Sequence, residues 1–172
     1  FLKSTEPKII LKIDLKGLYY CHRWGSLFCP WSNVQRMDIP RVTGLGPSYE
    51  FDFIGVKFKD EEEFYQNIPL RLAAKLLTEQ RPLWLTAVQH SCRSGDCKPE
   101  LYSDAVEHKL TNGTPFKGLI AMFVHRYEVL AQLLGFHFYI PTNNCEEPTH
   151  KLLNLLKEVK KESDRLDFNP LP

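Results

Sequence analysis

The chain has 172 residues, which is enough for one sizeable hydrophobic core or for two small cores that share an interface. Hydrophobic residues make up 43% and charged residues 25% of the sequence, and these ordinary globular values exclude wholesale disorder. The formal net charge of +1 excludes the strongly basic balance that is typical of a nucleic-acid-binding domain.

Residues 8–39 predict a β-hairpin. Apolar and polar side chains alternate through KIILKIDLKGLY at 8–19, a period of two that is typical of a strand with one buried face. The segment LFCPWSNVQRMDI at 27–39 predicts the second strand, and Gly25 supplies the permissive backbone of the turn. Pro30 lacks the N–H that a central strand needs, so the second strand is an edge strand or carries a bulge.

A loop, a strand and a helix follow the hairpin. The segment PRVTGLGPS at 40–48 contains two glycines and two prolines and predicts a loop. The segment YEFDFIGVKFK at 49–59 alternates apolar and charged residues and predicts a strand. Acidic residues then open a predicted helix at 60–68, where the helix dipole favours negative charge.

The next three segments are a predicted helix, a predicted short strand and a predicted loop. LRLAAKLLTEQ at 70–80 is a strong helix former, and RPLWLTAVQ at 81–89 predicts a short strand. The segment HSCRSGDCKPELYSD at 90–104 predicts a polar loop.

Two helices and a strand complete the prediction. The apolar stretch at 116–135 predicts a long helix that ends at Gly135. FHFYIP at 136–141 predicts a strand that Pro141 stops. The last helix, at 146–166, has an apolar face made by Leu152, Leu155, Leu156, Val159 and Leu166.

These elements predict an α+β fold, with an N-terminal antiparallel β-sheet followed by a helix-rich half with two short strands. We expect a sheet region at 1–68 that ends in a helix, helix–strand units packed on it at 69–166, and a frayed tail at 167–172. The helix ends AKLL at 74–77 and AQLLG at 131–135 each precede a predicted strand. This similarity suggests either two repeated α–β units or a chance match.

The five cysteines are irregularly spaced, which makes a poor disulfide framework and favours a reducing compartment. Cys21 and Cys29 face each other if the hairpin loop is the three residues 24–26, and they point to opposite faces if it is the two residues 24–25. The alternatives are therefore a disulfide and two reduced thiols that pack as small apolar groups, and the reducing compartment favours the thiols.

The sharpest metal hypothesis is a zinc site made by His90, Cys92 and Cys97, with His108 as a further ligand. Four residues separate Cys92 from Cys97, a spacing that zinc knuckles permit, but no second matching pair follows. The alternatives, which we favour, are a flexible loop and a loop closed by a Cys92–Cys97 disulfide on exposure to air. No G-x-S-x-G elbow and no phosphate-binding glycine motif is present. The sequence therefore predicts no catalytic residue, no cofactor and no metal, with this site as the alternative.

The predicted hairpin resembles the first hairpin of bacterial pleckstrin-homology-like (PH-like) domains. The matching residues are Gly17, Leu18, Trp24, Gly25, Pro30, Trp31, Ser32 and Val34. The segment IGVKFKDEEEFYQNI at 54–68 also fits that pattern. Over residues 5–160, the chain is similar to the soluble part of a small family of uncharacterised proteobacterial inner-membrane proteins, in which a pair of membrane helices precedes a domain of this kind.

This resemblance implies a PH-like sheet followed by helices, in a domain that is tethered to the inner membrane and faces the cytoplasm. It implies no activity. The chain itself contains no uncharged apolar run of the roughly 18 residues needed to cross a bilayer. Because the chain begins at Phe1 without a methionine and ends in DFNPLP, we expect it to be a piece of a longer protein whose membrane segments lie outside it.

Three residues form a candidate interaction surface: Trp24, Arg71 and Arg126. Trp24 at the hairpin tip either enters a membrane interface or a partner groove, or folds back on the hairpin. Arg71 and Arg126 lie in or beside apolar helical stretches, either as ligands for an anionic head group or with their guanidinium groups extended into water, and we favour water.

We therefore expect a non-enzymatic cytoplasmic domain of a membrane-anchored bacterial protein. Its predicted role is protein interaction, with an unknown protein partner, no nucleic acid, and a membrane reached only through segments outside this chain. The alternatives are a thiol- or zinc-dependent enzyme that uses the 90–108 loop, and a lipid-binding module.

Overall fold

The computed structural model describes residues 10–44, 46–93, 95, 98–143 and 145–168. The predicted α+β class is confirmed, with antiparallel sheets that precede most of the helices. In chain order the elements are β1 (Ile10–Ile13), β2 (Gly17–His22), β3 (Gly25–Pro30), β4 (Val34–Asp38), β5 (Arg41–Gly44), β6 (Gly46–Glu50), β7 (Phe53–Phe58), α1 (Glu61–Asn67), α2 (Leu70–Glu79), α3 (Arg81–Arg93), the 3₁₀ turn η1 (Pro99–Tyr102), β8 (Glu107–Lys109), β9 (Pro115–Lys117), α4 (Gly118–Leu134), β10 (Phe138–Pro141) and α5 (Thr149–Phe168).

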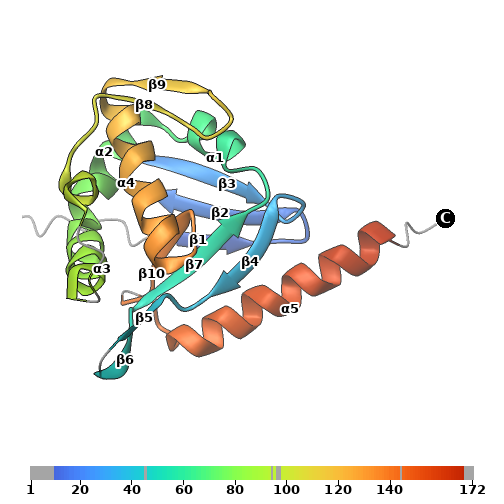
Figure 1. The fold of residues 1–172 in the computed structure, drawn as a ribbon. Coiled ribbons are helices and arrows are strands. Elements are labelled where there is room, and N and C mark those ends of the chain that lie inside the picture. The colour runs from blue at the N-terminus through green and yellow to red at the C-terminus, as the bar shows by residue number, and fades with distance from the viewer. Residues whose placement is uncertain (1–9, 45, 94, 96–97, 144, 169–172) are drawn as a thin grey trace, which may run out of the picture.

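Two three-stranded antiparallel sheets form the centre of the molecule (Figure 1). The first has the strand order β1–β2–β3, and the second has the order β10–β7–β4. β10 comes from the helix-rich half of the chain, so the second sheet joins the two predicted regions. The small hairpins β5–β6 and β8–β9 lie outside these sheets.

An aromatic cluster joins the two sheets in one core. The ring of Phe138 on β10 lies 5.3 Å from the ring of Tyr20 on β2 and 5.3 Å from that of Phe64 on α1. Phe64 in turn lies 4.8 Å from Phe58 on β7. All four side chains are buried. Aromatic pairs at these distances add specific stabilisation to the burial of their area.

The helices pack against different parts of the molecule. α4 packs with α2, with α3 and with the β8–β9 hairpin, while α5 runs along β4 and β7 (Figure 1). Near the far end of α5, the Ser163 hydroxyl donates to the backbone oxygen of Leu15 at 2.7 Å, which ties this helix to the first sheet as well. Among the described helices, none has both the length and the apolar character needed to cross a bilayer.

The hairpin loop differs from both predicted loops. His22 pairs with Gly25 across the strands, so the loop is the two residues Arg23 and Trp24. The N–H of Trp24 donates to Nδ1 of His22 at 3.2 Å. Gly25 has a φ of 146°, a conformation that side chains disfavour, and this explains why glycine directly follows the loop.

The predicted second strand, residues 27–39, is wrong as a single strand. It ends at Pro30, and β4 begins at Val34 in the other sheet. Between them the N–H of Asn33 donates to Pro30 O at 3.0 Å and that of Val34 donates to Trp31 O at 3.1 Å. Pro30 cannot donate to a ladder, so the chain turns here and passes from one sheet to the next.

The predicted loop at 40–48 is also wrong, because it forms most of the small hairpin β5–β6. The predicted strand at 49–59 is interrupted at residues 51–52, between β6 and β7. The glycines and prolines of residues 40–48 correctly indicated a turn. Composition alone could not show that the residues on either side of this turn pair as β5 and β6.

The segment at 81–89 is helical and not a strand. α3 buries Leu83, Trp84, Ala87 and Val88, a spacing of four residues that matches one face of a helix. A short apolar run is compatible with a strand and with a buried helix, so the sequence pattern did not distinguish the two. The proposed α–β repeat is therefore wrong, since only the second helix end precedes a strand.

Other helices agree with the sequence. Asp60 caps α1 by accepting from the N–H groups of Glu62 and Glu63, and Gly135 ends α4 with a φ of 85°. The apolar face of α5 differs in part, because Leu153 is buried while Leu155 and Leu166 are exposed. α5 continues through Phe168, and residues 169–172 of the predicted tail lie outside the described residues.

Candidate functional site

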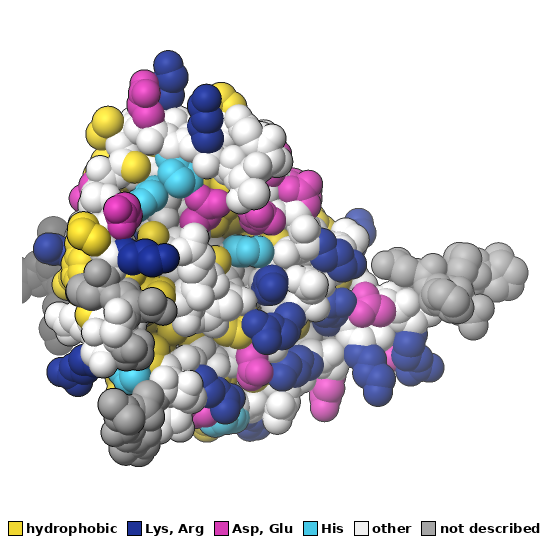
Figure 2. All heavy atoms as spheres, in the orientation of Figure 1, with side chains coloured by type: hydrophobic (Ala, Val, Ile, Leu, Met, Phe, Trp, Pro, Cys, Tyr) yellow, Lys and Arg dark blue, Asp and Glu magenta, His cyan; other side chains and the backbone are white. Residues whose placement is uncertain are grey.

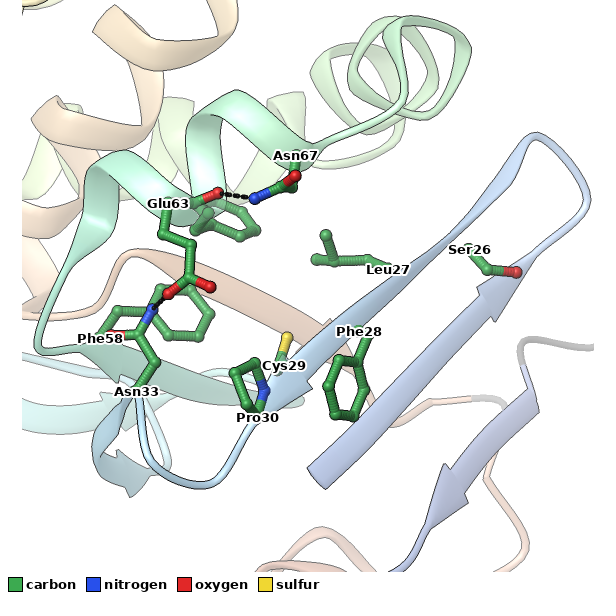
Figure 3. Close-up of a pocket in the computed structure, with 10 residues that line it drawn as sticks. Ser26, Leu27, Phe28, Cys29, Pro30, Asn33, Phe58, Glu63 and Asn67 are labelled. Atoms are coloured by element: carbon green, nitrogen blue, oxygen red, sulfur yellow. Dashed lines mark hydrogen bonds between the residues drawn. The ribbon is translucent and has the colours of Figure 1, made fainter. Parts of the chain in front are cut away.

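A groove of about 390 Å³ lies between β3 and α1 (Figure 3). One wall is the outer side of β3, and the other wall is the face of α1 that carries Glu63 and Asn67. The lining residues are Ser26, Leu27, Phe28, Cys29, Pro30, Asn33, Phe58, Glu63, Phe64 and Asn67. This volume falls within the range of ligand-binding clefts.

The β3 wall presents backbone groups. The N–H of Trp31 donates to Lys16 O at 3.2 Å, so alternate residues Leu27 and Cys29 direct their N–H and C=O groups at β2. Ser26 and Phe28 therefore direct theirs to the opposite side, toward the groove. Within the described residues, no hydrogen bond reaches the backbone of Ser26 or Phe28 from that side.

The α1 wall is fixed by Asn33. Its side-chain amide donates to Asp60 O at 2.9 Å and to Oε2 of Glu63 at 3.0 Å, and its Oδ1 accepts from the N–H of Asp60 at 2.8 Å. Figure 3 shows Glu63 reaching from α1 toward Asn33 across one end of the groove. The turn after β3 thus holds the first turn of α1 in place.

The floor of the groove is apolar. Leu27, Cys29, Phe58 and Phe64 are buried there. Burial raises the pKa of the Cys29 thiol to about 12, so this sulfur stays protonated near neutral pH and behaves as a small apolar group. The ring of Phe28 at the rim is 43% exposed and packs 4.5 Å from the ring of Tyr19.

Each of the other edges of the two sheets carries a feature that opposes strand addition. β1 carries the exposed Lys12, β4 has a register shift between Val34 and Arg36, and the first three residues of β10 are buried. Charges, proline, bulges and coverage are the usual means of preventing strand addition. β3, with the sequence GSLFCP, has no charged side chain, and Pro30 at its end is the position that cannot donate to an added strand.

The structure places the three candidate interaction residues apart from this groove. Trp24 is 41% exposed at the hairpin tip, with the guanidinium of Arg23 5.4 Å from the centre of its ring. The tip rests on α2, where His22 lies 3.5 Å from Glu79. Arg71 is exposed on α2.

Arg126 is buried, so its assignment to an exposed surface is wrong, and so is the expectation that it extends into water. Its guanidinium donates to Oδ1 of Asp104 at 2.7 Å and to Leu77 O at 2.8 Å, and it lies 4.5 Å from the centre of the Trp84 ring. α4 packs with α2 and α3, and the Arg126 side chain is only 10% exposed, beside the exposed Asp104.

The described residues of the predicted zinc site lie on different elements. Cys97 lies outside the described residues, while His90 and Cys92 lie on α3. His108 lies on β8, where it pairs with Glu128 of α4 and packs 5.2 Å from the ring of His125. The described residues contain no group of three histidine, cysteine or acidic side chains that could hold a metal ion.

Cys21 and Cys29 point to opposite faces of the hairpin. Cys21 pairs with Ser26 and Cys29 pairs with Leu18, so the two thiols are three positions out of register. Both cysteines are free, as the thiol alternative predicts.

Charged side chains on α5 form pairs and not a field of one sign. Lys160 lies 2.7 Å from Asp164, and Arg165 lies 2.9 Å from Glu162. Figure 2 shows basic and acidic side chains along this helix, with basic side chains gathered where the helix meets the second sheet.

Sequence reasoning missed Asn33, Glu63 and Asn67. A signal was present in PWSN at 30–33, since proline, serine and asparagine together mark a turn. The continuous strand predicted over 27–39 concealed that turn. The groove depends on which sheet edge stays open, and this is a property of the tertiary structure.

Comparison with known proteins gives one match. A family model with the description "Protein of unknown function (DUF2982)" matches residues 11–162. Neither the curated proteins nor the solved structures contain a match to the chain.

Proposed function

The chain belongs to the DUF2982 family of proteins of unknown function, and we propose that it is a non-enzymatic interaction domain that binds an extended segment of a partner protein. The segment lies in the groove between β3 and α1 and adds to the first sheet as a further strand. The observation that carries this proposal is the unpaired backbone of Ser26 and Phe28 at the edge of β3, beside an apolar-floored groove.

The free backbone groups of Ser26 and Phe28 support strand addition. An added strand forms main-chain hydrogen bonds to such groups, and these supply affinity whatever the partner's sequence. Apolar side chains of the added strand gain a floor made by Leu27, Phe58 and Phe64. Backbone pairing and apolar burial together are the means by which peptide-binding domains hold extended ligands.

The chemistry of the groove supports a binding role without catalysis. Its lining contains two ionisable side chains, Cys29 and Glu63. Because burial raises the pKa of Cys29 to about 12, the thiol is a poor nucleophile and a poor general acid.

The cellular setting remains part of the proposal. We propose that the domain lies at the cytoplasmic face of a bacterial inner membrane, attached through segments outside this chain, because of its resemblance to the soluble part of a small family of proteobacterial inner-membrane proteins. An antiparallel sheet followed by helices agrees with that resemblance. Retention of the intact gene product in the membrane pellet after an alkaline carbonate wash would support this setting, and release would contradict it.

Selection of peptides tests the interaction role. Random peptides displayed on phage are selected on the immobilised chain, and the strongest binder is titrated into ¹⁵N-labelled chain. We expect the amide signals of β3 and α1 to shift. Shifts confined to other surfaces would contradict the proposal.

A pair of variants at one position sharpens this test. Ser26→Pro removes an N–H that points into the groove but none that bonds to β2, so the hairpin stays intact while peptide binding weakens about tenfold or more. Ser26→Ala keeps the N–H and is expected to bind nearly as well as the original chain. Equal binding by both variants would show that the peptide does not pair with β3.

A further inference from the structure

We infer that the segment bound in the groove carries a lysine or arginine side chain, which pairs with the Glu63 carboxylate. This inference rests on the proposed function, and it specifies the chemistry of the partner.

The groove has a negative charge of its own. Glu63 is the acidic side chain among its lining residues, and it is exposed on the α1 wall. Its Oε2 accepts from Asn33 at 3.0 Å. Within the described residues, Oε1 accepts no hydrogen bond, and no lysine, arginine or histidine lies within ion-pair distance of this carboxylate. The carboxylate is thus positioned by one oxygen and open at the other.

Asn67 adds a second acceptor on the same wall. It lies four residues after Glu63, so the two side chains share one face of α1. Its Nδ2 donates to the backbone oxygen of Glu63 at 2.7 Å, which leaves Oδ1 and the second N–H of Nδ2 unused. Figure 3 shows both residues on α1, with the Glu63 carboxylate directed toward Asn33.

The open oxygen of Glu63 matches a cation. A lysine ammonium has three N–H groups and an arginine guanidinium has five, so either can donate to this carboxylate. A carboxylate on the partner would meet repulsion from Glu63. The charge of the groove therefore favours a basic segment over a neutral or acidic one.

A second copy of the chain does not fit through the same strand. An antiparallel pair of β3 strands would present GSLFCP to the groove, and this segment has no cation to meet Glu63. The occupant that the groove favours is a separate extended segment with a basic side chain.

Matched hexapeptides test the inference on the full chain. The probes are acetylated and amidated peptides of alternating threonine and valine, with lysine, glutamine or glutamate at the third or at the fourth position. The two positions place the variable side chain on either face of the added strand. Each peptide is titrated into ¹⁵N-labelled chain at low ionic strength, and Kd is taken from the shifts of the Ser26 and Phe28 amides.

We expect the better of the two lysine peptides to bind about three- to fivefold more tightly than its glutamine counterpart, and the glutamate peptide to bind most weakly. Glu63→Gln should remove the preference. Glu62→Gln removes a charge one residue away, outside the groove lining, and should keep the preference.

The outcomes separate this inference from the proposed function. Equal affinities for the three peptides, with shifts at Ser26 and Phe28, would overturn the basic segment and leave strand addition intact. A preference that survives in Glu63→Gln would overturn the assignment to this carboxylate. Absence of shifts in β3 with every hexapeptide and with the selected peptide would overturn both proposals.

Discussion

Asn33 and Asp60 bond to each other twice although 27 residues separate them: the side-chain amide of Asn33 donates to the Asp60 carbonyl at 2.9 Å, and its Oδ1 accepts from the Asp60 N–H at 2.8 Å. Asn33 is only 8% exposed. These two hydrogen bonds fix the start of α1 against the turn that joins the two sheets. They therefore set the width of the groove at one end.

Replacement of Asn33 therefore has a direct cost. We expect Asn33→Ala to lower the free energy of unfolding by about 2 kcal/mol, because it leaves two backbone groups of Asp60 without their partners. Chemical denaturation measures this change. Asn67→Ala, at an exposed position on α1, is the control and is expected to change stability by no more than about 0.5 kcal/mol. Equal effects of the two substitutions would contradict the assigned role of Asn33.

Gly55 and Phe136 give a second prediction. A Cβ at position 55 would overlap the ring of Phe136, although the backbone of Gly55 does not need glycine for its φ. We expect Gly55→Ala to cost about 2 kcal/mol of stability through overpacking. The cost should fall by about 1 kcal/mol or more when Phe136 is also replaced by alanine. Simple additivity in this double-mutant cycle would show that the ring is not the obstacle.

Substitution of the two arginines of the candidate surface should have very different effects on the stability of the protein. Arg126→Ala removes a buried guanidinium that bonds to Asp104 and Leu77, and we expect a loss of about 3 kcal/mol. Arg71→Ala, at an exposed position on α2, should change the free energy of unfolding by less than about 0.5 kcal/mol. Thermal or chemical unfolding compares the pair, and similar losses would contradict the burial of Arg126.

His137 predicts a dependence of stability on pH. Burial lowers the pKa of His137 from 6.5, the nearby Glu61 opposes that shift, and Lys57 adds to it. Its Nδ1 also accepts from the N–H of Phe58 at 3.1 Å, a bond that the protonated ring cannot form. The folded state therefore favours the neutral ring, and the unfolded state takes up the proton first as the pH falls.

The contribution of His137 is thus fully present above about pH 6.5 and is lost as the pH falls from there toward the lowered pKa of the folded state. We expect the free energy of unfolding to fall between about pH 7.5 and pH 5.5, and to fall less steeply in His137→Gln. Denaturation at a series of pH values measures both slopes. A variant slope equal to or steeper than that of the original chain would refute this role.

Local signals predicted several elements of the fold. Gly135 marked the end of α4, and the acids after Asp60 marked the start of α1, because helix ends depend on a few neighbouring residues. The apolar run at 81–89 misled the prediction because such a run fits a buried helix as well as a strand. Its burial pattern depends on packing with α2, α4 and β5, which the local sequence does not contain.

The groove was beyond sequence reasoning for a related reason. Pro30 did indicate an edge strand or a bulge, and β3 is an edge strand. The open space beside β3 depends on the position of α1. Asn33 and Asp60 fix this position through contacts between distant parts of the chain. The cysteines of the hairpin show the same limit, since the loop position alone determined that Cys21 and Cys29 point apart.

The central claim is that β3 accepts another strand on its outer side, and amide hydrogen exchange along β3 tests it most directly. In the chain alone, we expect fast exchange at Ser26 and Phe28 and slow exchange at Leu27 and Cys29, whose N–H groups face β2. Saturation with the selected peptide should protect Ser26 and Phe28 and leave Leu27 and Cys29 as they were. Unchanged exchange at Ser26 and Phe28 in the peptide complex would contradict the account.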